Sequence, residues 1–397
     1  MTQTSSRIIP LLLRPLDGLF FRDARPFAAR DSGRSTLPTP QSAFGAIKTH
    51  LMHSLRLAPN DLHGLHPGGP QVQSPHAWIG AMRVRGPWLY LEKAAPGADT
   101  GPLVRAPADI VFPKHAPAGA ETKAIRLRPL DEPPPYWAPA EPGLLPLWSP
   151  IHEPLVPADG FLDLSSLTSY LRGDENLRII PSRQLFRWSR RTGIGVDPDS
   201  ARTGDGNIYS TSNLFLSPGV CFYIEVLLPD TAPPSDTLFP ANLSLPWGGE
   251  GHRVEAQRLA TATKWPFVPP VDGRLLSLLI TPGIFSGAGH TWKPQQRGAL
   301  VSASIPRPLP ISGWDLAGDA QSGRRPGPRP TRFAVPAGAV YLWKRSERKA
   351  MPGEPDGPPA VDNLADRPRD ADAGWGISLC GTWHFHSPTP PGKGRAA

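Results

Sequence analysis

The sequence predicts an α+β protein built around two sheets, and three observations support this class. Short apolar runs with strand-like patterns occur at the start of the chain, between 184 and 259, and again between 275 and 383. One segment shows a clear helical repeat. Proline (53 residues) and glycine (39) are abundant in the 397-residue chain, yet 39% of the residues are hydrophobic, so we expect about two folded domains with long proline-rich insertions.

The first elements are a strand and a helix. Residues 8–13 form an apolar run that ends at a turn around Asp17-Gly18, and Pro10 is expected to place this strand at a sheet edge or a bulge. Thr39-Pro40 is typical of a helix N-terminus. Apolar residues then recur three and four positions apart, which predicts a helix over residues 40–55.

Residues 58–175 read as a large irregular insertion, because proline and glycine interrupt every short apolar piece. Regular structure is expected to resume with three strands at hairpin spacing, at 184–196, 207–216 and 220–228. A further strand at 254–259 completes the first sheet. The loop 197–206 is too long and polar for a tight turn, so the first two strands predict a projecting hairpin over about 187–212.

The second sheet is predicted from five segments, at 275–280, 299–305, 309–314, 340–344 and 376–383. This divides the chain into a first domain over 1–265 and a second over 266–386. Loops at about 318–330 and 346–373 are rich in proline and glycine, and the tail 387–397 lacks a periodic pattern. We expect all three segments to be mobile and the tail to be disordered.

Charge and cysteine content restrict the environment of the protein. The formal net charge is +8, and only nine of the 42 cationic side chains are lysine. Arginine binds phosphate in bidentate fashion and stacks on bases, although a GC-rich genome would enrich arginine as well. Cys221 and Cys380 read as core residues, and no apolar stretch approaches the length of a membrane span. We therefore expect a cytoplasmic protein with no membrane association.

The common catalytic and cofactor motifs are missing, including phosphate loops, nucleophile elbows and zinc-protease helices. No cofactor is expected. His50 and His53, like His63 and His66, are three residues apart, but they lack further ligands at metal spacing, and no metal site is expected. His384 and His386 alternate on the last predicted strand, where an acid–base pair is the alternative reading.

Three segments have features that are typical of anion-binding sites, namely arginine side chains, exposed backbone amides or glycines. An arginine-rich loop with Arg22 and Arg25 leads into the first helix, whose N-terminal amides are free to bind negative charge, although Asp23 offers these arginines a local partner. The strand 187–196 combines arginines with Trp188 and ends in glycines. The segment 374–376 places glycines where another backbone approaches closely.

Together these segments resemble the RAMP superfamily of CRISPR proteins, and within it the subunits of type III-B (Cmr) effector complexes that hold the 5′ tag of the guide RNA. The resemblance covers the chain from end to end, and its departures are Ala24 and Gly283. It rests on LDGLFFRDARPF (16–27), PTP (38–40) before Gly45-Ala46, RRTGIGVD (190–197), IYS (208–210), GGEGHR (248–253), TPGIF (281–285), GWG (374–376) and GTW (381–383).

The resemblance implies two ferredoxin-like (RRM-like, βαββαβ) units, the first carrying the proline-rich insertion. It also implies a non-catalytic subunit that binds the guide RNA (crRNA) tag beside the large polymerase-cyclase subunit and the backbone RAMP subunits, with target RNA only indirectly involved. The hairpin would act as a thumb that crosses the guide where tag meets spacer. The alternative is a RAMP endoribonuclease that processes guide precursor with His384, His386 or His50.

The residues expected to contact RNA lie in the three anion-binding segments, the first helix and the strands beside them. They are Arg22, Arg25, Ser42, Lys48, Arg183, Arg187, Arg190, Arg191, Thr192, Gly193, Gly195, Arg202, Gly374, Trp375 and Gly376.

Overall fold

The computed structural model describes residues 6–24, 35–58, 61, 65, 74–93, 98–115, 123–194, 208–286, 292–295, 297–315, 325, 327–345 and 360–386. Its class is mixed α and β with few helices, and the strand pairs of both large sheets are antiparallel. None of the described helices is long and apolar enough to cross a membrane.

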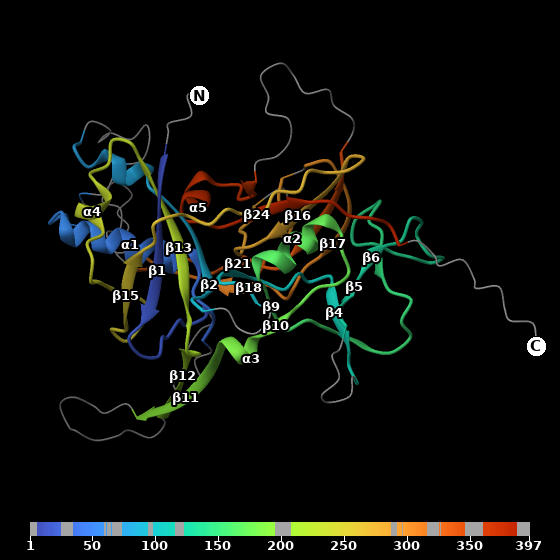
Figure 1. The fold of residues 1–397 in the computed structure, drawn as a ribbon, viewed down its shortest axis with the longest axis horizontal. Helices are drawn as coiled ribbons and strands as arrows, with labels where there is room; N and C mark the ends of the chain where they lie inside the picture. Colours follow the sequence, from blue (N-terminus) through green and yellow to red (C-terminus); the bar gives the residue numbers. More distant parts are fainter. Residues whose placement is uncertain are drawn as a thin grey trace, which may run out of the picture.

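The larger sheet has eight strands (Figure 1). In spatial order these are β10 (Ile180–Pro181), β9 (Gly160–Leu162), β3 (Gly101–Arg105), β2 (Arg83–Leu91), β13 (Val220–Pro229), β1 (Ser6–Pro15), β15 (Arg253–Arg258) and β14 (Leu243–Pro246). The strands predicted at 8–13, 220–228 and 254–259 are therefore neighbours in this sheet.

The smaller sheet has five strands, and the segments predicted at 275–280, 299–305, 340–344 and 376–383 all belong to it. In spatial order the strands are β17 (Ala299–Ser304), β22 (Val340–Lys344), β16 (Arg274–Leu279), β24 (Ile377–Gly381) and β23 (Val361–Asn363). The segment 309–314 was wrongly assigned to it. That segment forms β18 (Leu309–Ile311), which pairs with β21 (Arg332–Ala334), and starts β19 (Trp314–Asp315), which pairs with β20 (Gly327–Pro328).

Helices are few and mostly short. They are α1 (Pro40–Ser54), α2 (Leu164–Arg172), α3 (Ser182–Leu185), α4 (Ser235–Leu238), α5 (Pro368–Asp372) and the 3-10 helix η2 (Ala77–Ala81). The helix predicted at 40–55 is α1, and its N-cap is Thr39, whose side chain accepts a hydrogen bond from the Ser42 amide.

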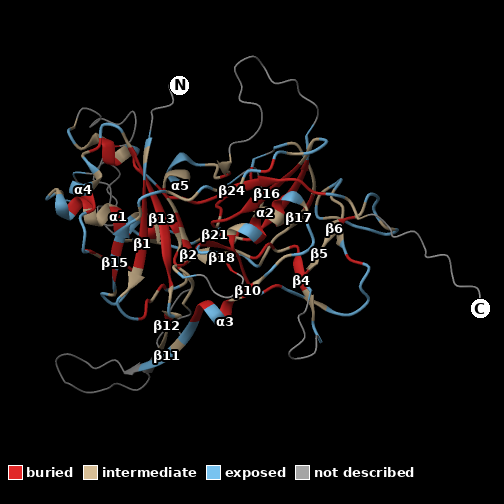
Figure 2. Cartoon of the chain, in the orientation of Figure 1, coloured by how far each residue is buried: buried red, intermediate tan, exposed pale blue. Residues whose placement is uncertain are grey.

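Successive side chains of a strand point to opposite faces of its sheet, so the apolar residues of the two large sheets form three core clusters. One lies between α1 and the larger sheet, one between the two sheets, and one on the outer face of the smaller sheet. Leu11 and Leu13 of β1 join α1 on one face of the larger sheet, whereas Leu12 faces the other way. On that second face the larger sheet packs against Leu278 and Leu342 of the smaller sheet and against α2. The Trp88 Nε1–H donates to the Ile280 carbonyl at 2.9 Å, so the contact between the sheets is polar as well as apolar. Figure 2 shows the central strands of the two sheets, such as β13 and β16, as mostly buried.

The outer face of the smaller sheet has its own cluster, which includes Leu275, Tyr341 and Cys380. Both cysteines are free and buried, as expected for core residues.

The predicted insertion boundaries were wrong. β2 lies within residues 58–175, yet it pairs with the central strand β13. The sequence obscured this strand because Gly86-Pro87 interrupts its pattern, and the sheet accommodates the interruption with a register shift opposite Tyr223 and Glu225. Among the described residues the irregular part is 106–115 and 123–159. It carries the three-stranded sheet of β5 (Ile125–Arg126), β4 (Ile110–Pro113) and β8 (Leu155–Pro157), and the pair β6 (Arg128–Pro129) and β7 (Leu147–Trp148).

Pro10 does not mark a sheet edge, because β1 lies between β13 and β15. The β15 register begins one residue later, at Leu11, and the Pro10 carbonyl accepts from the Leu259 amide just beyond β15. Carbonyl and nitrogen of a strand residue point to the same side, so the missing N–H of Pro10 falls at the end of that ladder.

The loop predicted at 346–373 is ordered in its second half, where β23 pairs with β24 and α5 follows. A proline at the first position of α5 and a strand of only three residues hid these elements. The predicted tail 387–397, residues 346–359 and most of 318–330 lie outside the described residues.

Candidate nucleic-acid interface

A two-stranded hairpin projects from the body of the protein (Figure 1). It consists of β11 (Phe186–Ile194) and β12 (Ile208–Leu216), which pair with each other in an unbroken register from Phe186↔Leu216 to Ile194↔Ile208. These are the strands predicted at 184–196 and 207–216. The hairpin places Arg187, Arg190 and Arg191 on an exposed ribbon, together with Thr192.

The two faces of this hairpin differ. Arg187 and Arg191 share one face with Phe215, and their guanidinium carbons lie 5.7 and 5.8 Å from the centre of its ring. Such contacts hold an arginine in place while its hydrogen-bond donors stay available. Trp188 and Arg190 point to the other face, and Trp188 is 41% exposed beside Phe186.

None of these three arginines forms an ion pair with another described residue. Arg183 is exposed on α3, just before the hairpin. Gly193 pairs with Tyr209 near its tip, whereas Gly195 and Arg202 lie outside the described residues.

The base of the hairpin brings together three segments that are distant in sequence. Leu19 and Leu214 exchange two backbone hydrogen bonds, of 2.9 and 2.7 Å. The neighbouring Phe20 carbonyl accepts from the Gly249 amide at 2.8 Å. The glycine-rich turn that begins at Gly248, the arginine-rich hairpin and the first loop thus share one site.

Aromatic packing fixes this junction. The ring of Trp247 lies 5.1 Å from Phe21 and 5.1 Å from Phe222, edge-on to both. Trp247 and Phe222 are fully buried, and burying a side chain of this kind contributes roughly 1.5–3 kcal/mol. The base of the hairpin is therefore attached to the core cluster on the α1 face of the larger sheet.

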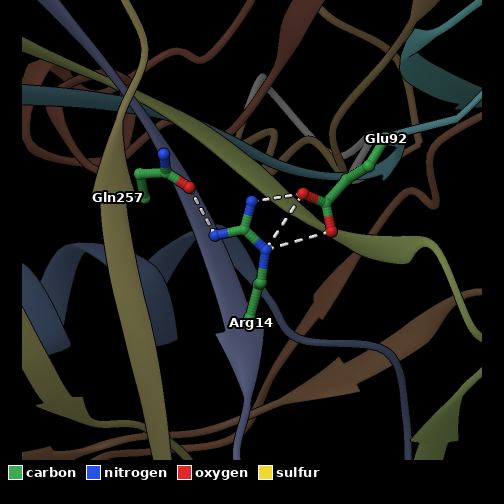
Figure 3. A network of polar contacts seen from close by, with 3 residues as sticks. All are labelled: Arg14, Glu92 and Gln257. Carbon is green, nitrogen blue, oxygen red and sulfur yellow. Dashed lines mark hydrogen bonds and ion pairs between the residues drawn. The ribbon is translucent and has the colours of Figure 1, made fainter. Parts of the chain in front are cut away.

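Two arginines at this end of the molecule, Arg14 and Arg22, differ in their exposure. Arg14 is neutralised, because its Nε donates to Glu92 at 2.9 and 3.0 Å and another nitrogen donates to Gln257 at 2.6 Å (Figure 3). The pairing raises the pKa of Arg14 and lowers that of Glu92. Arg22 is exposed where its backbone pairs with Ser35, and Arg25 lies outside the described residues.

Three cations lie near one another at α1. The Ser42 hydroxyl is used within the first turn, where it donates to the Thr39 carbonyl at 2.7 Å. Burial lowers the pKa of Lys48, and the charges of Arg369 and Arg329 lower it further. None of these three cations forms an ion pair with a described residue. We name this set, Lys48, Arg329 and Arg369, the α1 surface.

No sequence motif singles out Arg329 or Arg369, or the aromatic residues Trp314 and Phe333. Trp314 is 61% exposed and Phe333 58% exposed, on the short hairpins that follow β17. The neighbouring Gly313 packs against Gln41 of α1. The available signal was Trp314, an aromatic residue in the run 309–314 that was assigned to a sheet strand. The alternation of residues along a strand does not show which of its two faces points to the solvent.

Gly374, Trp375 and Gly376 are packed inside the protein. A Cβ atom at Gly374 would meet the Val84 carbonyl oxygen at 2.4 Å, and one at Gly376 would meet the Ala365 nitrogen at 2.8 Å. Trp375 is 1% exposed. The close backbone approach predicted for this segment is real, but the backbones concerned are those of β2 and the loop before α5.

The histidines of the catalytic alternative occupy ordinary packing positions. A ring nitrogen of His50 lies 2.7 Å from the Leu238 carbonyl oxygen, and the His386 ring packs edge-on against Trp148. Partial burial and then Arg128, Arg274 and Arg126 lower the pKa of His384. No group of three or more potential metal ligands gathers among the residues that the structure describes.

One protein-family model matches nearly the whole chain. The sequence model of the family described as "CRISPR-associated protein (Cas_Cmr3)" matches residues 11–383. No curated protein matches.

Two similar solved chains differ in coverage and in TM-score. One, from "Cryo-EM structure of the Type III-B Cmr-beta bound to cognate target RNA and AMPPnP, state 1", is 13% identical, with a TM-score of 0.45 over 84% of this chain and 86% of that chain. Another, from "Crystal structure of Csm1-Csm4 cassette in complex with AMPPNP", is 12% identical, with a TM-score of 0.32 over 96% of this chain and 99% of that chain.

Proposed function

Because the chain belongs to the Cas_Cmr3 family of CRISPR-associated proteins and is a type III-B effector subunit, we propose that it binds the 5′ tag of the guide RNA. The observation that carries this proposal is the projecting hairpin, on which Arg187 and Arg191 flank Phe215 without forming an ion pair among the described residues. Guanidinium groups held in this way bind phosphates of a single strand.

The hairpin also offers a surface on which a base can stack. Trp188, on the face opposite Phe215, is 41% exposed. Stacking of one base on an aromatic side chain contributes about 1–3 kcal/mol and tolerates any base. In this proposal the hairpin is the thumb, and it crosses the guide at the boundary between tag and spacer.

The α1 surface extends the proposed path of the RNA. Lys48, Arg329 and Arg369 are close enough for the two arginines to lower the pKa of the lysine. A phosphate among them would relieve that repulsion. We include Arg22, Arg183, Arg190 and Ser42 in the proposed RNA-contacting set, and we assign Gly374 to Gly376 a structural role instead.

We also propose that the two sheets are ferredoxin-like units. In the larger sheet the strands β15, β1, β13 and β2 are neighbours, and in the smaller sheet the corresponding neighbours are β24, β16, β22 and β17. Both runs have the order fourth, first, third, second along the chain, which is the order of a βαββαβ unit. Among the described residues of the second unit, the one helix is the short α5.

The subunit is proposed to be non-catalytic and to dock beside the large polymerase-cyclase subunit and the backbone subunits, in contact with target RNA only through the guide. A guide-processing endoribonuclease is the second candidate, with His384, His386 or His50 as acid or base. The His50 contact with a backbone carbonyl favours the first candidate.

Incubation of the purified chain with end-labelled repeat RNA separates the two candidates. Binding without cleavage, with an affinity that falls as salt increases, is the expected result, because each neutralised phosphate adds about −0.7 to the slope of log K against log salt. Cleavage of the RNA that His384→Ala abolishes would support the nuclease. A salt-independent affinity would contradict the cationic hairpin.

A further inference from the structure

One segment of the chain differs from the rest in charge and in exposure. Residues 131–157 contain four acidic residues and no lysine or arginine, in a protein whose formal charge is +8. We call this segment the acidic apron. Five of the twelve large hydrophobic side chains that are exposed in the described structure lie on it: Tyr136, Trp137, Trp148, Ile151 and Val156.

The apron is fixed to the smaller sheet. The Leu145 amide donates to the Val301 carbonyl at 2.8 Å, and the Ser302 hydroxyl donates to the Leu145 carbonyl at 2.8 Å. Lys293 forms an ion pair with Glu141. The two hydrogen bonds lie on β17, the edge strand of that sheet, so the segment that carries the exposed aromatic residues is attached to the sheet.

The backbone of Tyr136 has an unfavourable conformation. It follows three consecutive prolines, its φ is +64°, and its side chain is fully exposed. A left-handed conformation is unfavourable for a bulky residue, and such residues concentrate at functional sites. Beside it, the Trp137 Nε1–H donates to the Leu144 carbonyl at 2.8 Å, which orients an indole that is 42% exposed.

We propose that the acidic apron is the docking surface for a neighbouring protein subunit that presents lysine and arginine residues around an apolar patch. Tyrosine and tryptophan are the residues that most often dominate the binding energy of protein interfaces. Asp131, Glu132 and Glu153 are exposed around them and are complementary to a basic partner. The same charges repel RNA phosphates, so the apron is distinct from the hairpin surface.

The inference rests on the proposed function only in placing the chain within an effector complex. Its test therefore compares two measurements on the same full-length variants: incorporation into the co-expressed effector complex, and binding of tag RNA by the isolated chain. The docking variants are Tyr136→Ala, Tyr136→Ala with Trp137→Ala, and the triple charge reversal Asp131→Lys, Glu132→Lys, Glu153→Lys. The matched control is Phe267→Ala, which removes an aromatic side chain that is 44% exposed outside the apron.

Tyr136→Ala alone should lower incorporation, and the double variant should weaken it about tenfold or more, since truncation of interface anchors often costs that much. The charge reversal should also weaken incorporation at low salt, while all variants keep the parent melting temperature and RNA affinity. Normal incorporation of the double variant would overturn the proposal. If RNA binding is absent from the parent chain while the apron variants still dissociate, the tag-binding function fails and the docking surface stands.

A photoreactive residue in place of Tyr136 identifies the occupant in the assembled complex. The expected product is a cross-link to another protein subunit, at a peptide flanked by lysine or arginine. A cross-link to RNA or to a second copy of this chain, or the absence of any cross-link, would contradict the proposal.

Discussion

The ring of Phe215 lies against the α-carbon of Gly18, so that a Cβ atom at Gly18 would come within 2.6 Å of the ring. Phe215 in turn supports the guanidinium groups of Arg187 and Arg191 on its own face of the hairpin. The glycine of the first loop thus determines where the ring beneath two proposed RNA-binding cations can lie.

Gly18→Ala should weaken RNA binding several-fold, because the added methyl group displaces Phe215 and the arginines that rest on it. Overpacking of this kind costs roughly 1–3 kcal/mol. The control is Gly45→Ala on α1, where the new methyl group meets nothing within 4 Å and should stabilise the helix by about 0.5–1 kcal/mol. Parent-like RNA affinity of Gly18→Ala would show that the position of Phe215 does not matter.

Replacement of Arg187 and Arg191 together by alanine should reduce the dependence of RNA affinity on salt. If each arginine neutralises one phosphate, the slope of log K against log salt should become about 1.4 less steep. Stability should stay within about 0.5 kcal/mol of the parent, because both side chains are exposed. Arg258→Ala, which removes a surface arginine paired with Asp236, is the control and should leave the slope unchanged.

Gly374→Val should destabilise the protein more than Gly219→Val. Both glycines have a positive φ, of +88° and +77°, but only Gly374 would place its Cβ atom against a backbone oxygen, that of Val84. The strained conformation alone costs about 1–2 kcal/mol at either position. The additional loss at Gly374 is measured by chemical denaturation, and equal losses at the two sites would refute the close packing of the 374–376 loop on β2.

Cys221 and Cys380 should resist alkylation in the native protein. Burial is the main cause that raises the pKa of each thiol to about 12. At pH 8 the reactive thiolate is therefore about one part in ten thousand or less. Mass spectrometry after iodoacetamide treatment should show labelling of neither cysteine without denaturant and of both in urea, and rapid native labelling would contradict the burial of both strands.

Sequence patterns predicted the helix α1, the two hairpin strands and seven of the thirteen strands of the two large sheets. In each case the local signals agree, as for Thr39-Pro40 and the apolar repeat that follows it in α1. β2 was missed because Gly86-Pro87 breaks its pattern, and only pairing with β13 across the sheet reveals it as a central strand. Long-range pairing is information that a local pattern does not contain.

In the candidate site, too, residues with a local sequence signal were predicted and residues brought together by the fold were not. The arginines of β11 were found because they are dense in the sequence. Arg329 and Arg369 were missed, since each lies in a proline-rich stretch and joins the α1 surface only through the fold. Trp314 was missed because the run that contains it was assigned to a sheet strand. Trp375 is the opposite case. Its position between two glycines suggested a contact with RNA, but its indole is buried.

The central claim, that this chain holds the 5′ tag of the guide RNA, is tested most directly by chemical footprinting of the guide in the assembled effector complex. Complexes that contain the parent chain should protect the tag nucleotides from backbone cleavage. Complexes that contain Arg187→Ala with Arg191→Ala should lose protection at the tag while the spacer remains protected. Equal protection of the tag in both complexes would contradict the claim.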